Sequence, residues 1–228
     1  MPACLAQANV PNMKSLAQAG AYTLRSVTDH ISMSAPSWTS MLTAVNRSRH
    51  RVFENTFAHS RVNVSVPSIF TQIHNAGLNI ASIASWDPIN DVFGTPDTCK
   101  HSVKCSGNDN TVVDVACTLL QTDPDLHFMF LHFDEIDHAG HEHGFSTDSA
   151  EYVAQIERAD AQVGRVIDAL ASRGAKENWL VIITTDHGGK LRGHGSHEAA
   201  NRHTFVILSG CDYATRGLHN CVCWCGLP

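Results

Sequence analysis

The sequence lacks the features that mark membrane, nucleic-acid-binding and zinc-ribbon proteins. Its longest apolar runs are about seven or eight residues, too short to span a bilayer. No basic cluster stands out, and the formal net charge of −6 argues against a nucleic-acid backbone as partner. The eight cysteines form no CxxC pair, which makes a zinc ribbon a poor interpretation. The opening "MPACLAQANVPNMK" has neither the basic start nor the apolar core of a secretory signal peptide.

Histidine is the residue type in excess. The chain of 228 residues, long enough for one α/β domain with a real core, has 15 histidines. Five of them lie between His127 and His143. Imidazole is the commonest metal ligand and the usual proton carrier near neutral pH. A His-rich surface is the alternative explanation for any single histidine, but clustering beside acids at strand ends favours a site.

Strands and helices are expected to alternate along the chain. Proline starts, glycine ends and helical spacing of apolar residues predict helices at 11–20, 67–77 and 148–173, with a further helix near Pro36. Apolar runs predict buried strands at 78–86, 126–133, 179–185 and 204–210. This pattern predicts an α/β fold with a mostly parallel sheet sandwiched by helices. In such sheets ligands bind outside the carboxyl ends of the strands.

The first polar cluster, "DEIDHAGHEHG", follows the predicted strand at 126–133. Asp137 and His141 are four residues apart, so a helical turn after the strand would point both side chains to one side. A carboxylate oxygen with an imidazole nitrogen suits zinc or manganese. The alternative is a surface turn with a local hydrogen bond.

The second polar cluster, "DHGGKLRGHGSH", follows the predicted strand at 179–185. Asp186 and His187 stand at the strand end, where a turn at the next two glycines could bring both onto one ion. His194 and His197 lie in a loop that could fold back as a further ligand. The alternative for Asp186 and His187 is a helix N-cap. Because both clusters follow parallel strands, they are expected to meet at one edge of the sheet.

A serine nucleophile is the third candidate feature. Ser34 stands just before the helix predicted near Pro36. A hydroxyl at a helix N-terminus lies in positive potential, beside N–H groups that can hold an anion. A metal ion there would lower its pKa and activate it as a nucleophile. The alternative is that Ser34 only caps the helix.

Four stretches, in this order, resemble the type I phosphodiesterase/nucleotide pyrophosphatase branch of the alkaline phosphatase superfamily. They are "ANVPNMKSLAQAGAYT", "SAPSWTSMLTAVNRSRHRVFEN", "FDEIDHAGHEHGF" and "TTDHGGKLRGHG". The resemblance covers residues 8 to about 210. It implies an alkaline phosphatase-like fold and a hydrolase of phosphate esters with two divalent metal ions, usually zinc.

The resemblance also implies roles for individual residues. Ser34 matches the nucleophile, which would pass through a phosphoserine intermediate, and Asn55 matches an asparagine that holds a phosphate oxygen. Asp137, His141 and His194 match the ligands of one metal, with His197 in reserve for His194. Asp186 and His187 match ligands of the other metal.

The chain departs from the family's pattern in three places. Relatives have glycine where this chain has Ala44 and Arg51. The family's first strand, which ends in a metal-binding Asp, has no counterpart, so the sheet is expected to lack that strand and to expose the edges beside it. Residues 1–213 are therefore expected to form an incomplete alkaline phosphatase-like metallohydrolase domain, and 214–228 a Cys-rich tail of unknown role.

The leading functional prediction is metal-dependent hydrolysis of a small phosphate ester. A degenerate, non-catalytic member that binds a metal or a partner is the alternative. A sulfatase is disfavoured because Ser34-Ala35-Pro36-Ser37 is followed by Trp38 and not by the arginine of that family's pattern. The monoester, diester and pyrophosphate classes of substrate stay open. The resemblance favours a secreted or membrane-attached protein, in which Cys99, Cys105 and Cys117 could form disulfides.

Overall fold

The computed structural model describes residues 2–55, 57, 66–174 and 177–210. The strands are β1 (Ala21–Val27), β2 (Asn79–Ala84), β3 (His101–Lys104), β4 (Leu126–His132), β5 (Val181–Thr184) and β6 (His203–Ser209). The helices are α1 (Pro2–Gln7), α2 (Pro11–Ala19), α3 (Ser34–Thr43), α4 (Arg47–His50), α5 (Ile69–Asn75), α6 (Pro88–Val92), α7 (Asp109–Thr122), α8 (Glu135–His143), α9 (Ala150–Ala171) and α10 (Ala199–Arg202). The predicted α/β class is confirmed.

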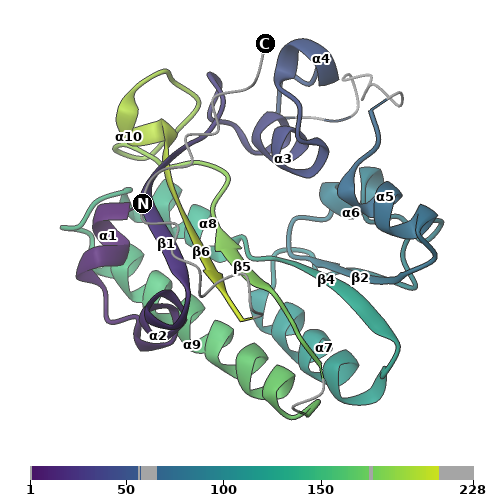
Figure 1. The fold of residues 1–228 in the computed structure, drawn as a ribbon. Helices are drawn as coiled ribbons and strands as arrows, with labels where there is room; N and C mark the ends of the chain where they lie inside the picture. Colours follow the sequence, from purple (N-terminus) through teal and green to yellow (C-terminus); the bar gives the residue numbers. More distant parts are fainter. Residues whose placement is uncertain (1, 56, 58–65, 175–176, 211–228) are drawn as a thin grey trace.

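The strands of the described residues form two sheets (Figure 1). One has the order β3-β2-β4, and both of its pairings are parallel. The other has the order β1-β6-β5, and both of its pairings are antiparallel. The expectation of one mostly parallel sheet is therefore corrected: the strand runs gave the α/β class, but strand direction and pairing come from contacts between distant segments.

Helix α9 joins the two sheets (Figure 1). Its first half, with Tyr152 and Ile156, packs with Phe205 and Ile207 of β6. Its second half, with Ala169, packs in a cluster with residues of β2, α7 and β4. Apolar residues spaced at helical intervals give α9 the stripe that both contacts need.

The parallel sheet is covered on both faces, as predicted. Helix α7 packs on one face through Val112 and Ala116, in a cluster with Ile83 of β2. On the other face, Phe70 of α5 and Leu42 of α3 pack with Ile80. The antiparallel sheet differs, because among the described residues its helical cover comes from α1, α2 and α9 on one face.

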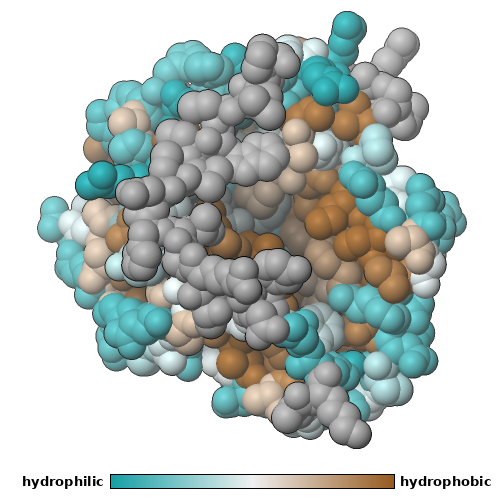
Figure 2. Space-filling view, in the orientation of Figure 1, coloured by the Kyte–Doolittle hydropathy of each residue, from teal (hydrophilic) through white to brown (hydrophobic). Residues whose placement is uncertain are grey.

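Strands β5 and β4 are edge strands in their own sheets. Both were predicted to be buried on both faces. Ile182 of β5 is nevertheless 58% exposed, and Phe128 and Phe130 of β4 are only half-buried. Figure 2 shows hydrophobic residues gathered along a hollow in the middle of the same view, between the halves that carry β5 and β4 in Figure 1. This agrees with the expected exposure of strand edges, since each strand has a neighbour on one side only.

Local details differ from the sequence-based expectations at element ends. The cap of α9 is Ser149, whose side chain accepts a hydrogen bond from the Tyr152 N–H, in place of Asp148. Strands β1 and β3 had no apolar run that predicted them. Cys99, Cys105 and Cys117 are free thiols, in place of the disulfides considered above, and Cys99 and Cys105 lie in different core clusters.

Two further expectations concern the ends of the chain and the membrane. The tail expected at 214–228 lies outside the described residues. Within the part of the chain that the structure describes, no helix is both long enough and apolar enough to cross a bilayer.

Candidate active site

Helix α8 carries the first polar cluster and begins directly after β4. Asp109, which is fully buried, holds its start: its two carboxylate oxygens accept the N–H groups of Asp134 and Glu135 at 2.9 and 3.1 Å. One turn further along, Asp137 Oδ2 lies 3.2 Å from His141 Nε2. The predicted helical turn after β4 is confirmed, and it puts both side chains on one face.

The second polar cluster follows β5 as an irregular loop. No helix starts after Asp186 and His187, so the N-cap alternative is wrong. Gly188 sits tightly against the backbone of residue 200, and its N–H donates to the Asn201 carbonyl at 2.8 Å. This close approach, possible without a Cβ, turns the chain back toward α8.

Three imidazoles from these segments meet at one place. The rings of His187 and His194 are stacked with centroids 3.8 Å apart. His194 Nε2 lies 3.1 Å from His141 Nε2 and 3.7 Å from Asp137 Oδ1. One ligand atom each from Asp137, His187 and His194 fall within 4.8 Å of one another.

The tautomers of the three imidazoles follow from their second nitrogens. The Nδ1 atoms lie 2.8–2.9 Å from backbone carbonyl oxygens: His141 from Arg192, His187 from Gly188 and His194 from Ser32. A carbonyl only accepts, so each Nδ1 carries the proton and donates it. In the neutral imidazole each Nε2 then offers a lone pair, which is the form that binds a metal ion.

Ser34 is the first residue of α3 and faces this cluster. The N-cap position belongs to Met33, and Ser34 makes no capping hydrogen bond, so the capping alternative is wrong. Its Oγ lies 3.3 Å from His187 Nε2, and that nitrogen lies 3.4 Å from Asp186 Oδ2. The hydroxyl is therefore placed against the imidazole cluster from a rigid helix.

Asn55 is tied to the same helix. Its Oδ1 accepts the Ala35 N–H at 2.8 Å, which leaves its Nδ2 group as a donor. The first turn of α3 offers less to an anion than the sequence suggested. Ala35 donates to Asn55, Pro36 has no N–H, and Ser37 donates to the Met33 carbonyl. Among the described residues, the Ser34 N–H is the one left in that turn without a partner.

Burial shifts the pKa values of several groups in and beside the cluster. Burial, with a contribution from neighbouring His187, lowers the pKa of His194 to about 4. Burial raises the pKa of Asp186, and it raises the pKa of Asp134 to about 6 with help from Asp137. Buried carboxylates beside imidazole Nε2 atoms are the electrostatic setting that a cation would stabilise.

Hydrogen bonding points the same way. Asp137 Oδ1 and Asp186 Oδ2 are buried and have no hydrogen-bond partner among the described residues. The facing lone pairs of His141 and His194, 3.1 Å apart, repel each other unless a proton or cation lies between them. The residues present therefore fit a divalent cation. The two predicted ligand sets are not separate, because Asp137 and His194 of one set lie with His187 of the other.

Four contacts around the cluster had no motif in the sequence. Ser32 is fully buried; its carbonyl accepts from His194 Nδ1 and its hydroxyl accepts the Gly195 N–H at 3.0 Å. The Phe145 ring packs edge-on against His141 and His194, with centroids 5.4 and 6.2 Å away. Asp109 orients α8, as described above. Buried His132, at the end of β4, accepts the backbone N–H of Trp86 at its Nδ1. Burial lowers the pKa of His132 to about 3.

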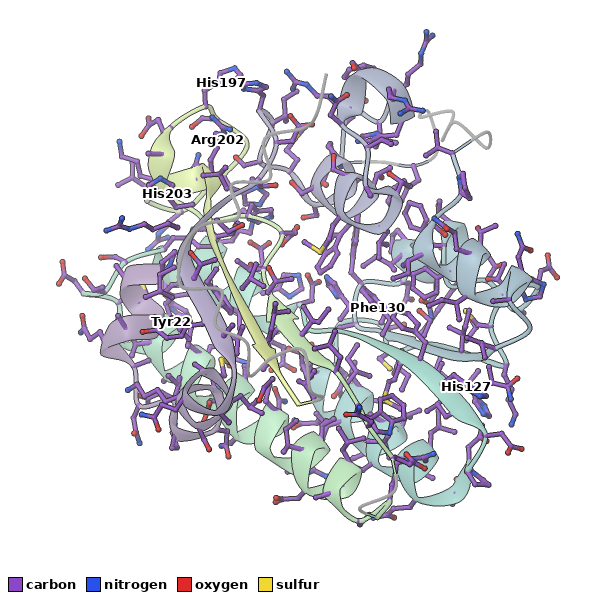
Figure 3. All side chains as sticks on the ribbon, in the orientation of Figure 1. Tyr22, His127, Phe130, His197, Arg202 and His203 are labelled. Atoms are coloured by element: carbon purple, nitrogen blue, oxygen red, sulfur yellow. The ribbon has the colours of Figure 1, made fainter. Side chains whose placement is uncertain are left out.

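His197, the reserve ligand, lies outside the cluster. It is exposed near α10, as Figure 3 shows, with its ring 6.1 Å from that of His30. The positions where relatives have glycine are also explained. Ala44 and Arg51 both have positive φ, 58° and 59°, a backbone conformation that glycine adopts without strain.

The fold is that of the alkaline phosphatase superfamily. A 2-O GAG sulfatase matches with a TM-score of 0.71 and 14% identity, over 90% of this chain and 59% of that one. Murine ectonucleotide pyrophosphatase/phosphodiesterase 5, an inactive variant with AMP, matches with a TM-score of 0.67 and 20% identity, over 83% and 54%. The phosphonate monoester hydrolase of Agrobacterium radiobacter matches with a TM-score of 0.65 and 15% identity, over 89% and 63%.

The sequence profile of one family in this superfamily, type I phosphodiesterase/nucleotide pyrophosphatase, matches residues 2–192. The chain belongs to that family. A search of curated proteins gave no match. The chain spans less than two thirds of the length of the matched structures.

Proposed function

We propose that this chain carries the active site of a metal-dependent hydrolase of phosphate esters that acts through a phosphoserine intermediate. The observation that supports it most strongly is the set of three Nε2 lone pairs from His141, His187 and His194, gathered with Asp137 beside Ser34 Oγ. Such a donor set suits a divalent cation of the zinc type.

The proposed chemistry begins at Ser34. Its oxygen attacks phosphorus, and the bond from phosphorus to the leaving alcohol oxygen breaks as the serine–phosphorus bond forms. Water then cleaves the serine–phosphorus bond and frees the phosphate. A cation held by Asp137, His187 and His194 would supply charge neutralisation for the phosphate oxygens and a lower pKa for the serine hydroxyl. Asp186 and His141 would lie beside the cation, as further carboxylate and imidazole groups.

Asn55 has a binding role in this proposal. Its Oδ1 is fixed by the Ala35 N–H, so its Nδ2 group is oriented to donate to a phosphate oxygen. The Ser34 N–H is the second donor available there. Two donors aimed at the oxygens that gain charge in the transition state stabilise it more than they stabilise the ground state.

The first test is the hydrolysis of bis-p-nitrophenyl phosphate. Zinc-loaded protein should be active, chelation should remove the activity, and Ser34→Ala should abolish it. Ser37→Ala is the matched control, because Ser37 lies one turn along the same helix and bonds Thr28 Oγ1 instead of the cluster. Turnover retained by Ser34→Ala would remove Ser34 from the mechanism.

Nucleotide esters are the substrate class to test next, because one matched structure holds AMP. The non-catalytic alternative also has an observation in its favour. Within the described part of the chain, one group of three residues, Asp137, His187 and His194, has ligand atoms close enough together to hold a metal ion. One tightly bound ion per chain with no esterase activity would favour that alternative. Two bound ions with turnover would favour the hydrolase with the two metal ions that the family resemblance implies.

A further inference from the structure

A second site lies around α4, separate from the imidazole cluster. A cavity of about 360 Å³ is lined by Arg47, Ser48, Arg51 and Phe53, and we name it the arginine pocket. Phe53 is 48% exposed, so an aromatic surface is open to a ligand there. The two pocket arginines and Arg49, a third arginine between them, fall within five residues of a chain whose formal net charge is −6.

Among the described residues, the arginines of this pocket have no acidic partner. Arg47 Nη1 is buried and makes no hydrogen bond with the described residues. None of the ion pairs found in the described part of the chain includes Arg47 or Arg51. The nearby acid Asp29 accepts backbone N–H groups, that of Arg47 among them, and makes no ion pair with either guanidinium.

The other polar group of the pocket is already used. Ser48 donates its hydroxyl hydrogen to Asn46 Oδ1 at 2.6 Å, so the arginines are the donors that remain for a ligand. A buried donor without a partner is costly, and an anion that reached Arg47 Nη1 from the pocket would remove that cost. Guanidinium groups bind the oxygens of phosphate and sulfate in pairs, with a geometry that ammonium groups do not provide.

We propose that the arginine pocket binds the phosphate or sulfate group of a small ligand. The resemblance supplies no counterpart, because Arg51 stands where relatives have glycine. The proposal does not depend on the proposed hydrolysis. Two sources share this chemistry: a free inorganic anion, or a second phosphate of the same ester that reacts at Ser34.

The test uses the full chain with Ser34→Ala, freed of metal, so that neither hydrolysis nor the metal site contributes. Titration calorimetry with inorganic phosphate and with sulfate should show binding. Arg47→Gln/Arg51→Gln should weaken that binding by about tenfold or more, as expected for charge-assisted hydrogen bonds. Arg25→Gln/Arg165→Gln removes the same charge elsewhere and should bind as before. Loss of affinity in both double variants alike, or in neither, would overturn the proposal.

Two additions keep the test interpretable. Arg47→Lys/Arg51→Lys keeps the charge and should bind phosphate at an intermediate strength. If this variant binds as weakly as the glutamine variant and has a normal circular dichroism spectrum, the result still supports binding of the anion by paired guanidinium hydrogen bonds. The source of the anion is separated with zinc-loaded protein that retains Ser34. A KM that rises in the glutamine variant only for a p-nitrophenyl nucleotide with an extra 3′-phosphate assigns the pocket to the substrate. Unchanged KM values assign it to a free anion.

Discussion

Replacing Gly140 by alanine tests how tightly the imidazole cluster is packed. Gly140 is buried inside α8, next to His141. A Cβ there would lie 2.2 Å from Phe145 Cε1, where ordinary contacts begin at 3.4 Å, so the ring would have to move by 1.2 Å. It has no room to do so, because a Cβ at Gly189 would lie 2.3 Å from the same ring.

Two effects of opposite sign set the change in the free energy of unfolding. Glycine to alanine in a helix interior gains about 1 kcal/mol from helix propensity. Overpacking a filled site costs typically about 1–3 kcal/mol. Because Phe145 is held between two glycines, we expect overpacking to win and Gly140→Ala to lower the free energy of unfolding by up to about 2 kcal/mol. Since Phe145 also packs on His141, zinc affinity should fall by about tenfold.

The assay is urea unfolding followed by circular dichroism, with zinc binding measured by calorimetry. Phe145→Leu replaces the ring by a shorter side chain. Gly140→Ala should therefore lower the free energy of unfolding by less in the Phe145→Leu protein, with a coupling energy of about 0.5–3 kcal/mol. Gly193→Ala is the control, because a Cβ there would meet nothing within 4 Å. Stabilisation by Gly140→Ala, or an equal cost with and without Phe145, would refute the reasoning.

Three further predictions follow from single contacts. Ser32→Ala should weaken zinc binding about 10- to 100-fold, since the Ser32 hydroxyl accepts the Gly195 N–H and donates to the Ser196 carbonyl, which holds the His194 loop. Ser26→Ala should leave zinc binding unchanged, and equal calorimetric affinities of the two variants would contradict this. Ala44→Gly should raise the free energy of unfolding by about 1 kcal/mol in urea melts, because φ is 58°; no change would mean that the position is not strained. Burial lowers the pKa of His50 from its ordinary value of about 6.5 to about 4 in the folded protein. As the pH falls, the unfolded chain therefore binds this proton before the folded protein does. The stability that is fully present above about pH 6.5 is lost as the pH falls toward 4. His50→Gln should remove roughly 3 kcal/mol of that loss in metal-free protein, and parallel pH profiles of the two proteins would contradict it.

The residues of the candidate site could be found from the sequence because their pattern is local. Asp137 and His141 share a helix face, and Asp186 and His187 end a strand; both statements need only a few neighbouring residues. Ser34 at the start of α3 is of the same kind. Two of the positions with positive φ, Ala44 and Arg51, were marked in the same way, because they differ from the glycines of relatives.

The chain's composition and spacing by themselves determined the α/β class, the positions of α2, α3, α5 and α9 and of β2, β4, β5 and β6, and the chemistry of the side chains at the strand ends. Only the tertiary structure decided that the strands form a parallel and an antiparallel sheet, that His187 joins Asp137 and His194, and that Arg47 has a buried guanidinium nitrogen without a partner. The physical reason is the distance along the chain over which each kind of interaction acts. Helical and strand periodicity act over a few residues, whereas pairing, burial and the meeting of segments about fifty residues apart depend on how the whole chain packs.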